Sequence, residues 1–138
     1  LVIVGTKAAG ERAGLTPRAR IRSFANASVE PMVMLTAAQD AAQIAMEKAG
    51  VTLADVDLIE LNEAFASVVL KFLRDLEVSE DKVNVNGGTI AAGHAMGATG
   101  AILISVLLDE LERQDKSIGL VAVSGGAGLG SAMVVERI

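Results

Sequence analysis

The chain has 138 residues, of which 51% are hydrophobic and only 2% are aromatic, so it has material for a single domain with an aliphatic core. Its formal net charge of −5 argues against a nucleic-acid-binding protein, because such proteins normally present a basic face. Since there is no cysteine, these residues contain no disulfide, no thiolate metal site and no cysteine nucleophile.

The predicted elements alternate between strands and helices along the chain. In order they are a strand over 1–4, a small helix over 7–12, a strand over 18–29, a helix over 36–49, a strand over 56–61, a helix over 65–76, a strand over 83–85, a helix over 97–113, and strands over 118–123 and 131–138. Helices between strands favour parallel neighbours, whereas the short glycine-rich segment between the last two strands predicts an antiparallel hairpin. The order after Pro17 is therefore βαβαβαββ, and the fold class is layered α/β.

The helix predicted over 97–113 is apolar nearly all round until Asp109, which is typical of a helix buried on more than one side. Its longest apolar run, Ala101–Leu108, is far too short to span a bilayer. No secretory leader is visible at the start of the sequence. We therefore expect a cytoplasmic domain with no membrane partner.

Three predicted strands end in residues suited to chemistry, at the sheet edge where α/β proteins form their sites. Asn62 follows the strand over 56–61, His94 lies in the glycine-rich segment after 83–85, and Ser124 follows 118–123. On spacing alone, Asn62 is more simply the N-cap of the next helix; the alternative is an amide that positions a water or a substrate oxygen. His94 is the only histidine, and it is either a hydrogen-bonded loop residue or a catalytic or oxyanion-binding group.

Nucleotide and metal sites are not supported by the motifs. Neither glycine cluster has the G-x-G-x-x-G spacing, and the segment Gly88–Gly93 is followed by His94 instead of the lysine of a P-loop. A single histidine without organised carboxylate partners argues against a bound metal.

Four motifs occur in a characteristic order: Arg20–Phe24, Asn62-Glu63-Ala64-Phe65-Ala66, Asn86–Gly100 with Gly93-His94 at its centre, and the loop Gly126–Gly130. In this order they resemble the C-terminal half of thiolases, the acyl-CoA acyltransferases that make or cleave 3-ketoacyl-CoA, over essentially the whole chain. The resemblance implies a five-stranded mixed sheet with helices on both faces. It also implies that residues 1–17 end a preceding N-terminal thiolase domain and that residues 18–138 form the C-terminal domain.

The resemblance implies a role for individual residues. His94 would polarise the thioester oxygen and help activate the nucleophile, while Asn62 would hold the water that completes the oxyanion hole. The backbone N–H of Gly126 would contribute to a second oxyanion hole, and Phe65 and Gly93 would contact the acyl or pantetheine part of the substrate. Coenzyme A or acyl-CoA would be the substrate, with no covalently bound cofactor, and the partners would be the N-terminal thiolase domain and further copies of the polypeptide, with no nucleic acid.

Two departures from the thiolase pattern predict that the chain is inactive by itself. The nucleophilic cysteine of thiolases lies in the N-terminal domain, and Ser124 stands where their acid/base cysteine shuttles a proton. Two other functions stay open. One is a non-catalytic thiolase-like domain that binds acyl-CoA or assembles with a partner; the other is half of a ketoacyl-synthase-type condensing enzyme, although such enzymes use a second histidine in this half.

Overall fold

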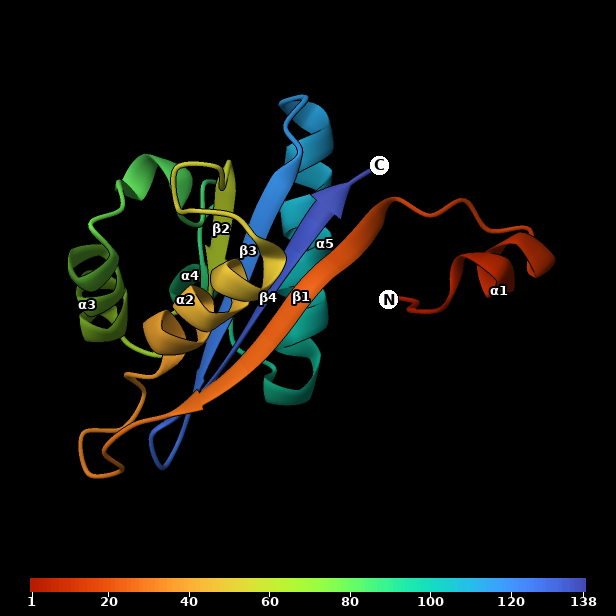
Figure 1. Ribbon diagram of the computed structural model, residues 1–138. Coiled ribbons are helices and arrows are strands. Elements are labelled where there is room, and N and C mark those ends of the chain that lie inside the picture. Colours follow the sequence, from red (N-terminus) through yellow and green to blue (C-terminus); the bar gives the residue numbers. More distant parts are fainter.

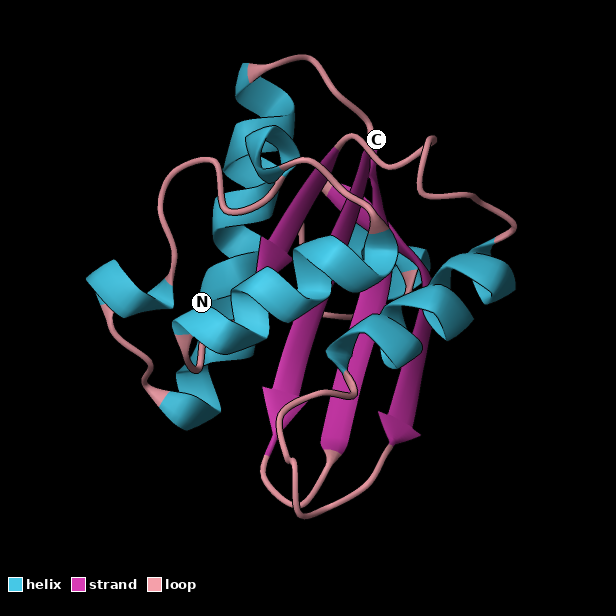
Figure 2. Ribbon diagram, turned by 90° about the vertical axis from the view of Figure 1, so that its left-hand side faces the viewer, coloured by secondary structure: helices cyan, strands magenta, loops and turns pink.

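A computed structural model describes residues 1–138 and shows one sheet with helices on both faces (Figures 1 and 2). The helices are α1 (Lys7–Arg12), α2 (Ala38–Ala49), α3 (Ala66–Leu76), α4 (Thr89–Ala92) and α5 (Thr99–Arg113), with short 3₁₀ turns η1 (Glu80–Lys82) and η2 (Met96–Ala98). The strands are β1 (Ala19–Ser28), β2 (Leu58–Leu61), β3 (Ile118–Gly125) and β4 (Leu129–Arg137). The predicted layered α/β class is confirmed.

The four strands lie in the order β1-β4-β3-β2. β2 and β3 are parallel, whereas β4 is antiparallel to both of its neighbours. The predicted hairpin of the last two strands is confirmed, with Gly125 paired to Leu129 across the turn. Gly128 in this turn has a φ of +75°, and a Cβ there would lie 2.4 Å from the carbonyl oxygen of Val29, so only glycine fits.

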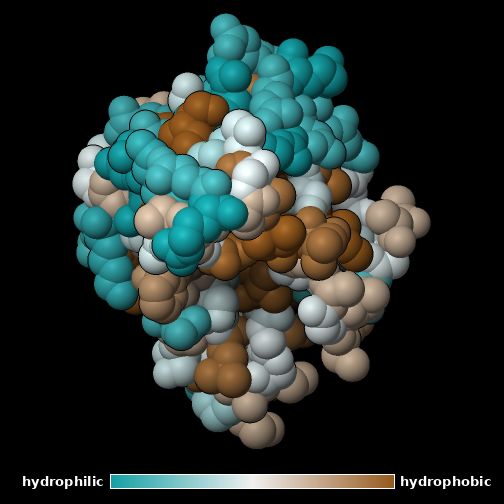
Figure 3. Space-filling model, turned by 90° about the vertical axis from the view of Figure 1, so that its right-hand side faces the viewer, coloured by the Kyte–Doolittle hydropathy of each residue, from teal (hydrophilic) through white to brown (hydrophobic).

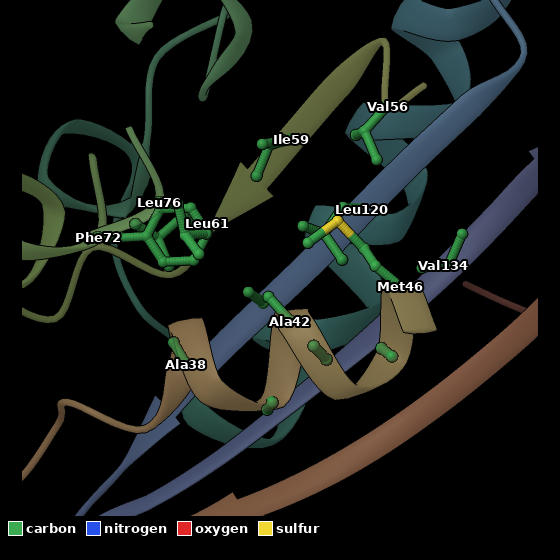
Figure 4. Close-up of a cluster of buried hydrophobic side chains, with 14 of the residues drawn as sticks. Ala38, Ala42, Met46, Val56, Ile59, Leu61, Phe72, Leu76, Leu120 and Val134 are labelled. Carbon is green, nitrogen blue, oxygen red and sulfur yellow. The ribbon is translucent and has the colours of Figure 1, made fainter. Parts of the chain in front are cut away.

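One face of the sheet packs against α2 and α3. The alanines of α2 are all buried, and their small side chains let the helix lie close to the strands. A Cβ on Gly130 of β4 would come within 2.4 Å of the Ala37 backbone. Figure 4 shows Phe72 and Leu76 of α3 beside Leu61 at the end of β2, where they continue this core.

The other face packs against α5. Leu103, Leu107 and Leu111 follow one side of the helix at a spacing of four residues and contact Leu58, Val121 and Val135 of the sheet. Other apolar residues of α5 are partly exposed, and Ile102 retains 44% of its accessible surface. The prediction that this helix is buried on more than one side is therefore wrong within this chain, because the sheet covers one side only.

The predicted five-stranded sheet has four strands, because residues 83–85 do not form one. Val83 makes a single parallel bridge to Ile59, and the strand then breaks off because Asn84 adopts a left-handed φ of 50°. The Asn84 side chain takes over the pairing: its Oδ1 accepts from the Leu61 N–H at 2.7 Å and its Nδ2 donates to the Leu61 carbonyl at 3.0 Å. A side-chain amide thus replaces a backbone peptide at this edge.

The prediction of a strand over 1–4 is also wrong in this structure. These residues form no regular element, and Leu1, Ile3 and Val4 are exposed. Helix α1 follows as predicted but buries no residue, and it projects away from the sheet in Figure 1. A strand needs a neighbour to satisfy its backbone groups, and none of the four strands pairs with this segment.

The surface combines charged and apolar regions. On the side that carries α1, hydrophobic side chains gather between hydrophilic areas (Figure 3). None of the helices has the length and apolar character needed to cross a bilayer.

Candidate active site

Five of the six predicted site residues line one cavity of about 430 Å³, which is within the usual size of a small-molecule site. They are Asn62, Phe65, His94, Ser124 and Gly126. Because β2 and β3 are parallel, their carboxyl ends bring Asn62 and Ser124 to the same edge of the sheet. The sixth residue, Gly93, does not line the cavity. Glu63 also lines a second cavity of about 540 Å³, between α3 and residues 80–85, which contains none of the predicted residues.

Asn62 is wholly buried and continues the backbone pairing of β2. Its N–H donates to the Ala122 carbonyl on β3 at 2.9 Å. Its side-chain Oδ1 accepts from the Thr89 hydroxyl at 3.1 Å, and its Nδ2 has no hydrogen-bond partner. The N-cap interpretation is wrong, since α3 begins at Ala66 after Phe65 and has no side-chain cap.

Ser124, which also lines the cavity, carries a second buried polar atom without a hydrogen-bond partner. The residue lies on β3 opposite Gly130, is 5% exposed, and its Oγ makes no hydrogen bond. Buried polar groups without partners are rare in folded proteins, because each loses its hydrogen bonds to water. Two of them, Asn62 Nδ2 and Ser124 Oγ, lie at one cavity, and such a site is suited to a ligand that carries polar oxygen atoms.

His94 lies on the exposed side of the cavity. Its Nδ1 is 2.7 Å from the hydroxyl of Thr99, the buried first residue of α5. This contact orients the ring from a fixed helix and leaves Nε2 as the nitrogen available to a ligand. Gly93 allows the chain to reach this position, since its φ of +93° is unfavourable for other residues.

Glu63 joins the segment before His94 to the end of β2. Its Oε1 accepts from Asn84 Nδ2 and its Oε2 from the Ile90 N–H, both at 2.9 Å, while its own N–H donates to Thr89 Oγ1 at 2.8 Å. The carboxylate occupies the space beside Gly88, where a Cβ would lie 1.9 Å from Glu63 Cδ. Sequence reasoning missed Thr89, because nothing in the local pattern shows that its hydroxyl meets residues 26 and 27 positions earlier.

Two buried carboxyl groups lie near the site on the side of α5. Burial, together with the neighbouring carboxylates of Glu63 and Glu110, raises the pKa of Glu60 on β2 to about 7. Glu110 on α5 shows the opposite behaviour: hydrogen bonds from Arg113, Asn86 and Gln114 lower its pKa to about 2. No three His, Asp or Glu side chains are arranged to hold a metal ion.

Comparison with known proteins identifies the family of this chain. Residues 15–137 match the family described as "Thiolase, C-terminal domain". The chain belongs to the thiolase family. The thiolase resemblance of the sequence motifs is therefore confirmed.

Thiolases of several bacteria align with nearly the whole chain. An acetyl-CoA acetyltransferase of Escherichia coli is 45% identical over 137 residues, which is 99% of this chain and 35% of the relative. A 3-ketoacyl-CoA thiolase of Cronobacter sakazakii is 41% identical over 140 residues, again 99% of this chain and 36% of the relative. The crystal structure of the Bacillus anthracis acetyl-CoA acetyltransferase superposes with a TM-score of 0.91 at 35% identity, covering 96% of this chain and 34% of that one. The chain thus spans about a third of the length of these thiolases.

Proposed function

We propose that the polypeptide carrying this chain is a thiolase-type acyltransferase, which cleaves or forms 3-ketoacyl-CoA with coenzyme A as a substrate. This chain would supply the groups that stabilise negative charge on the substrate oxygen. The observation that carries the proposal is the cavity that Asn62, His94, Ser124 and Gly126 line together. The relatives named acetyl-CoA acetyltransferase and 3-ketoacyl-CoA thiolase support it.

The chemistry requires donors around one oxygen atom. Claisen condensation and its reversal build negative charge on a thioester oxygen. Each fixed hydrogen-bond donor at that position stabilises the transition state by about 3 kcal/mol. His94 Nε2 would donate directly, and Asn62 Nδ2 would hold the water that donates beside it. The backbone N–H of Gly126 would serve a second oxyanion hole, and Phe65, which is 62% exposed at the cavity rim, would contact the acyl or pantetheine part together with Gly93.

Ser124 limits this chemistry. A cysteine with a pKa of about 8.5 releases its proton near neutral pH, whereas a serine hydroxyl needs a strong base beside it. Ser124 Oγ has no hydrogen-bond partner, so no such base contacts it. The nucleophilic thiol must also come from outside these residues, because the chain has no cysteine. The chain alone would therefore be inactive.

The domain boundaries follow from the same proposal. Residues 1–17 would end the N-terminal thiolase domain and residues 18–138 would form the C-terminal domain. In support, α1 buries no residue and stands apart from the sheet, and the partly exposed apolar side of α5 is suited to contact with that domain. Further copies of the polypeptide would complete a homo-oligomer.

A second function is favoured by Ser124 alone. Because a serine hydroxyl does not release its proton near neutral pH without a neighbouring base, the domain would bind acyl-CoA or assemble with a partner without catalysis. Binding of acetoacetyl-CoA without turnover is the behaviour that this alternative predicts.

The test is CoA-dependent thiolysis of acetoacetyl-CoA by the longest native form of the polypeptide, compared with Ser124→Cys and Ser124→Ala. A general acid or base contributes about 100-fold or more to a rate, so the native form should be slower than Ser124→Cys by at least that factor. Ser124→Ala serves as the control for a change of side chain without a thiol. Equal turnover in native and Ser124→Cys forms would show that another group carries the proton. If all three fold and bind acetoacetyl-CoA but none turns it over, the non-catalytic function is supported; absence of binding would refute both.

A further inference from the structure

We propose that Thr89 is a positioning residue whose hydroxyl determines which end of the Asn62 amide faces the cavity. The inference rests on the proposed function in one respect only, which is the role of Asn62 in the reaction. Its starting point is a pair of contacts that meet on one oxygen atom, Thr89 Oγ1.

A threonine hydroxyl carries one proton, and the two contacts of Thr89 Oγ1 decide where that proton points. The Glu63 N–H donates to this oxygen at 2.8 Å. The hydroxyl proton is therefore free to be donated, and its acceptor is Asn62 Oδ1 at 3.1 Å. With Oδ1 held by Thr89, the Nδ2 of the same amide must face the other way.

The reverse orientation of the amide would leave one more group without a partner than the observed orientation does. Nδ2 would then donate to Thr89 Oγ1, which already accepts from Glu63, and the hydroxyl proton would have no acceptor among these groups. Asn62 Oδ1 would turn toward the cavity instead of Nδ2. Thr89 is buried, with 7% exposure, so the hydroxyl proton would lose its acceptor at a position that bulk water does not reach.

Thr89 itself is held firmly enough to perform this role. It is the first residue of α4 and is anchored from the end of β2 by the Glu63 N–H. The adjacent Ile90 N–H donates to the Glu63 carboxylate, so two consecutive residues of α4 are tied to Glu63. The hydroxyl therefore cannot move away without breaking this network.

The orientation matters because the two ends of an amide bind opposite partners. Nδ2 offers hydrogen-bond donors to an oxygen or a water in the cavity, whereas Oδ1 would face a developing oxyanion with its lone pairs. The effect should be larger in the transition state, where the oxygen carries more negative charge, than in substrate binding. Losing Thr89 should thus lower kcat more than it changes KM.

The test compares Thr89→Val, which replaces the hydroxyl by a methyl group of similar size, with Thr89→Ser, which keeps the hydroxyl. In the longest native form of the polypeptide, or in its Ser124→Cys variant if that form alone is active, Thr89→Val should lower kcat for acetoacetyl-CoA thiolysis by about 10-fold or more. KM should stay within about twofold, and Thr89→Ser should restore most of kcat. A Thr89→Val protein with unchanged kcat would overturn the inference while leaving the proposed function intact.

A second readout decides the inference even if no form turns over acetoacetyl-CoA, an outcome that would count against the proposed function alone. The same protein is labelled with ¹³C and ¹⁵N at asparagine, and the Asn62 side-chain signals are assigned by their loss in Asn62→Asp. The Asn62 carbonyl carbon and amide nitrogen should shift in Thr89→Val, where the hydrogen bond to Oδ1 is lost, and return in Thr89→Ser. Unchanged Asn62 signals in a folded Thr89→Val protein would refute the inference, as would equal shifts in both variants.

Discussion

Replacing Glu60 by glutamine should remove a pH-dependent loss of stability. Glu60 lies on β2, is 2% exposed, and has a pKa that burial and the nearby carboxylates of Glu63 and Glu110 raise to about 7. Each of these three causes disfavours the charged form, so ionisation of Glu60 opposes folding.

The sign and size of the effect follow from the two pKa values. The ordinary pKa of 4.5 applies in the unfolded chain, so between about pH 4.5 and 7 the folded state binds more protons than the unfolded state. The free energy of unfolding therefore falls as the pH rises through this window. A pKa difference of this size corresponds to a destabilisation of about 3 kcal/mol. This destabilisation is present in full above pH 7 and absent below pH 4.5.

The assay is urea denaturation of the native chain and of Glu60→Gln at pH 5 and pH 8. Relative to the native protein, the variant should gain about 2.5 kcal/mol between the two pH values, because a small part of the loss has already occurred at pH 5. Glu110→Gln provides a control of opposite sign, because hydrogen bonds from Arg113, Asn86 and Gln114 lower the pKa of Glu110 to about 2. Its stabilising effect is complete above about pH 4.5 and is lost only as the pH falls toward 2, so Glu110→Gln should be destabilising by a constant amount from pH 5 to 8. Parallel stability curves for the native protein and Glu60→Gln would refute the reasoning.

Two further substitutions test the site and the core. Gly88→Ala should displace the Glu63 carboxylate, because the new Cβ would lie 1.9 Å from its Cδ. Losing the hydrogen bonds from Asn84 and Ile90 should lower the free energy of unfolding by about 2 kcal/mol. A melting temperature equal to that of the native protein would contradict this. Phe72→Ala should lower the free energy of unfolding in urea denaturation by about 3–5 kcal/mol, because Phe72 is fully buried. The control is Phe24→Ala at an exposed position of β1, which should change stability by only about 0.5 kcal/mol. Equal losses in the two variants would show that this core is not packed as described.

Local patterns in the sequence determined most of the elements. The buried alanines of α2, the helical spacing in α3 and the glycine-rich turn between β3 and β4 each carry a complete signal within a few residues. Such patterns report which face of an element is buried, and burial depends mainly on side-chain type and period. The arrival of Asn62, His94 and Ser124 at one edge of the sheet was also predictable, because it follows from the order of strands and helices.

Tertiary structure decided the pairing and the hydrogen bonds. β1 pairs with β4, more than a hundred residues later in the chain, and residues 83–85 fail to form a strand because the Asn84 side chain replaces the backbone at Leu61. Asn62 is held by Thr89, 27 residues away, and does not cap the helix beside it. A local sequence pattern reports the burial of a residue, whereas the direction of a hydrogen bond depends on which distant group meets it in space.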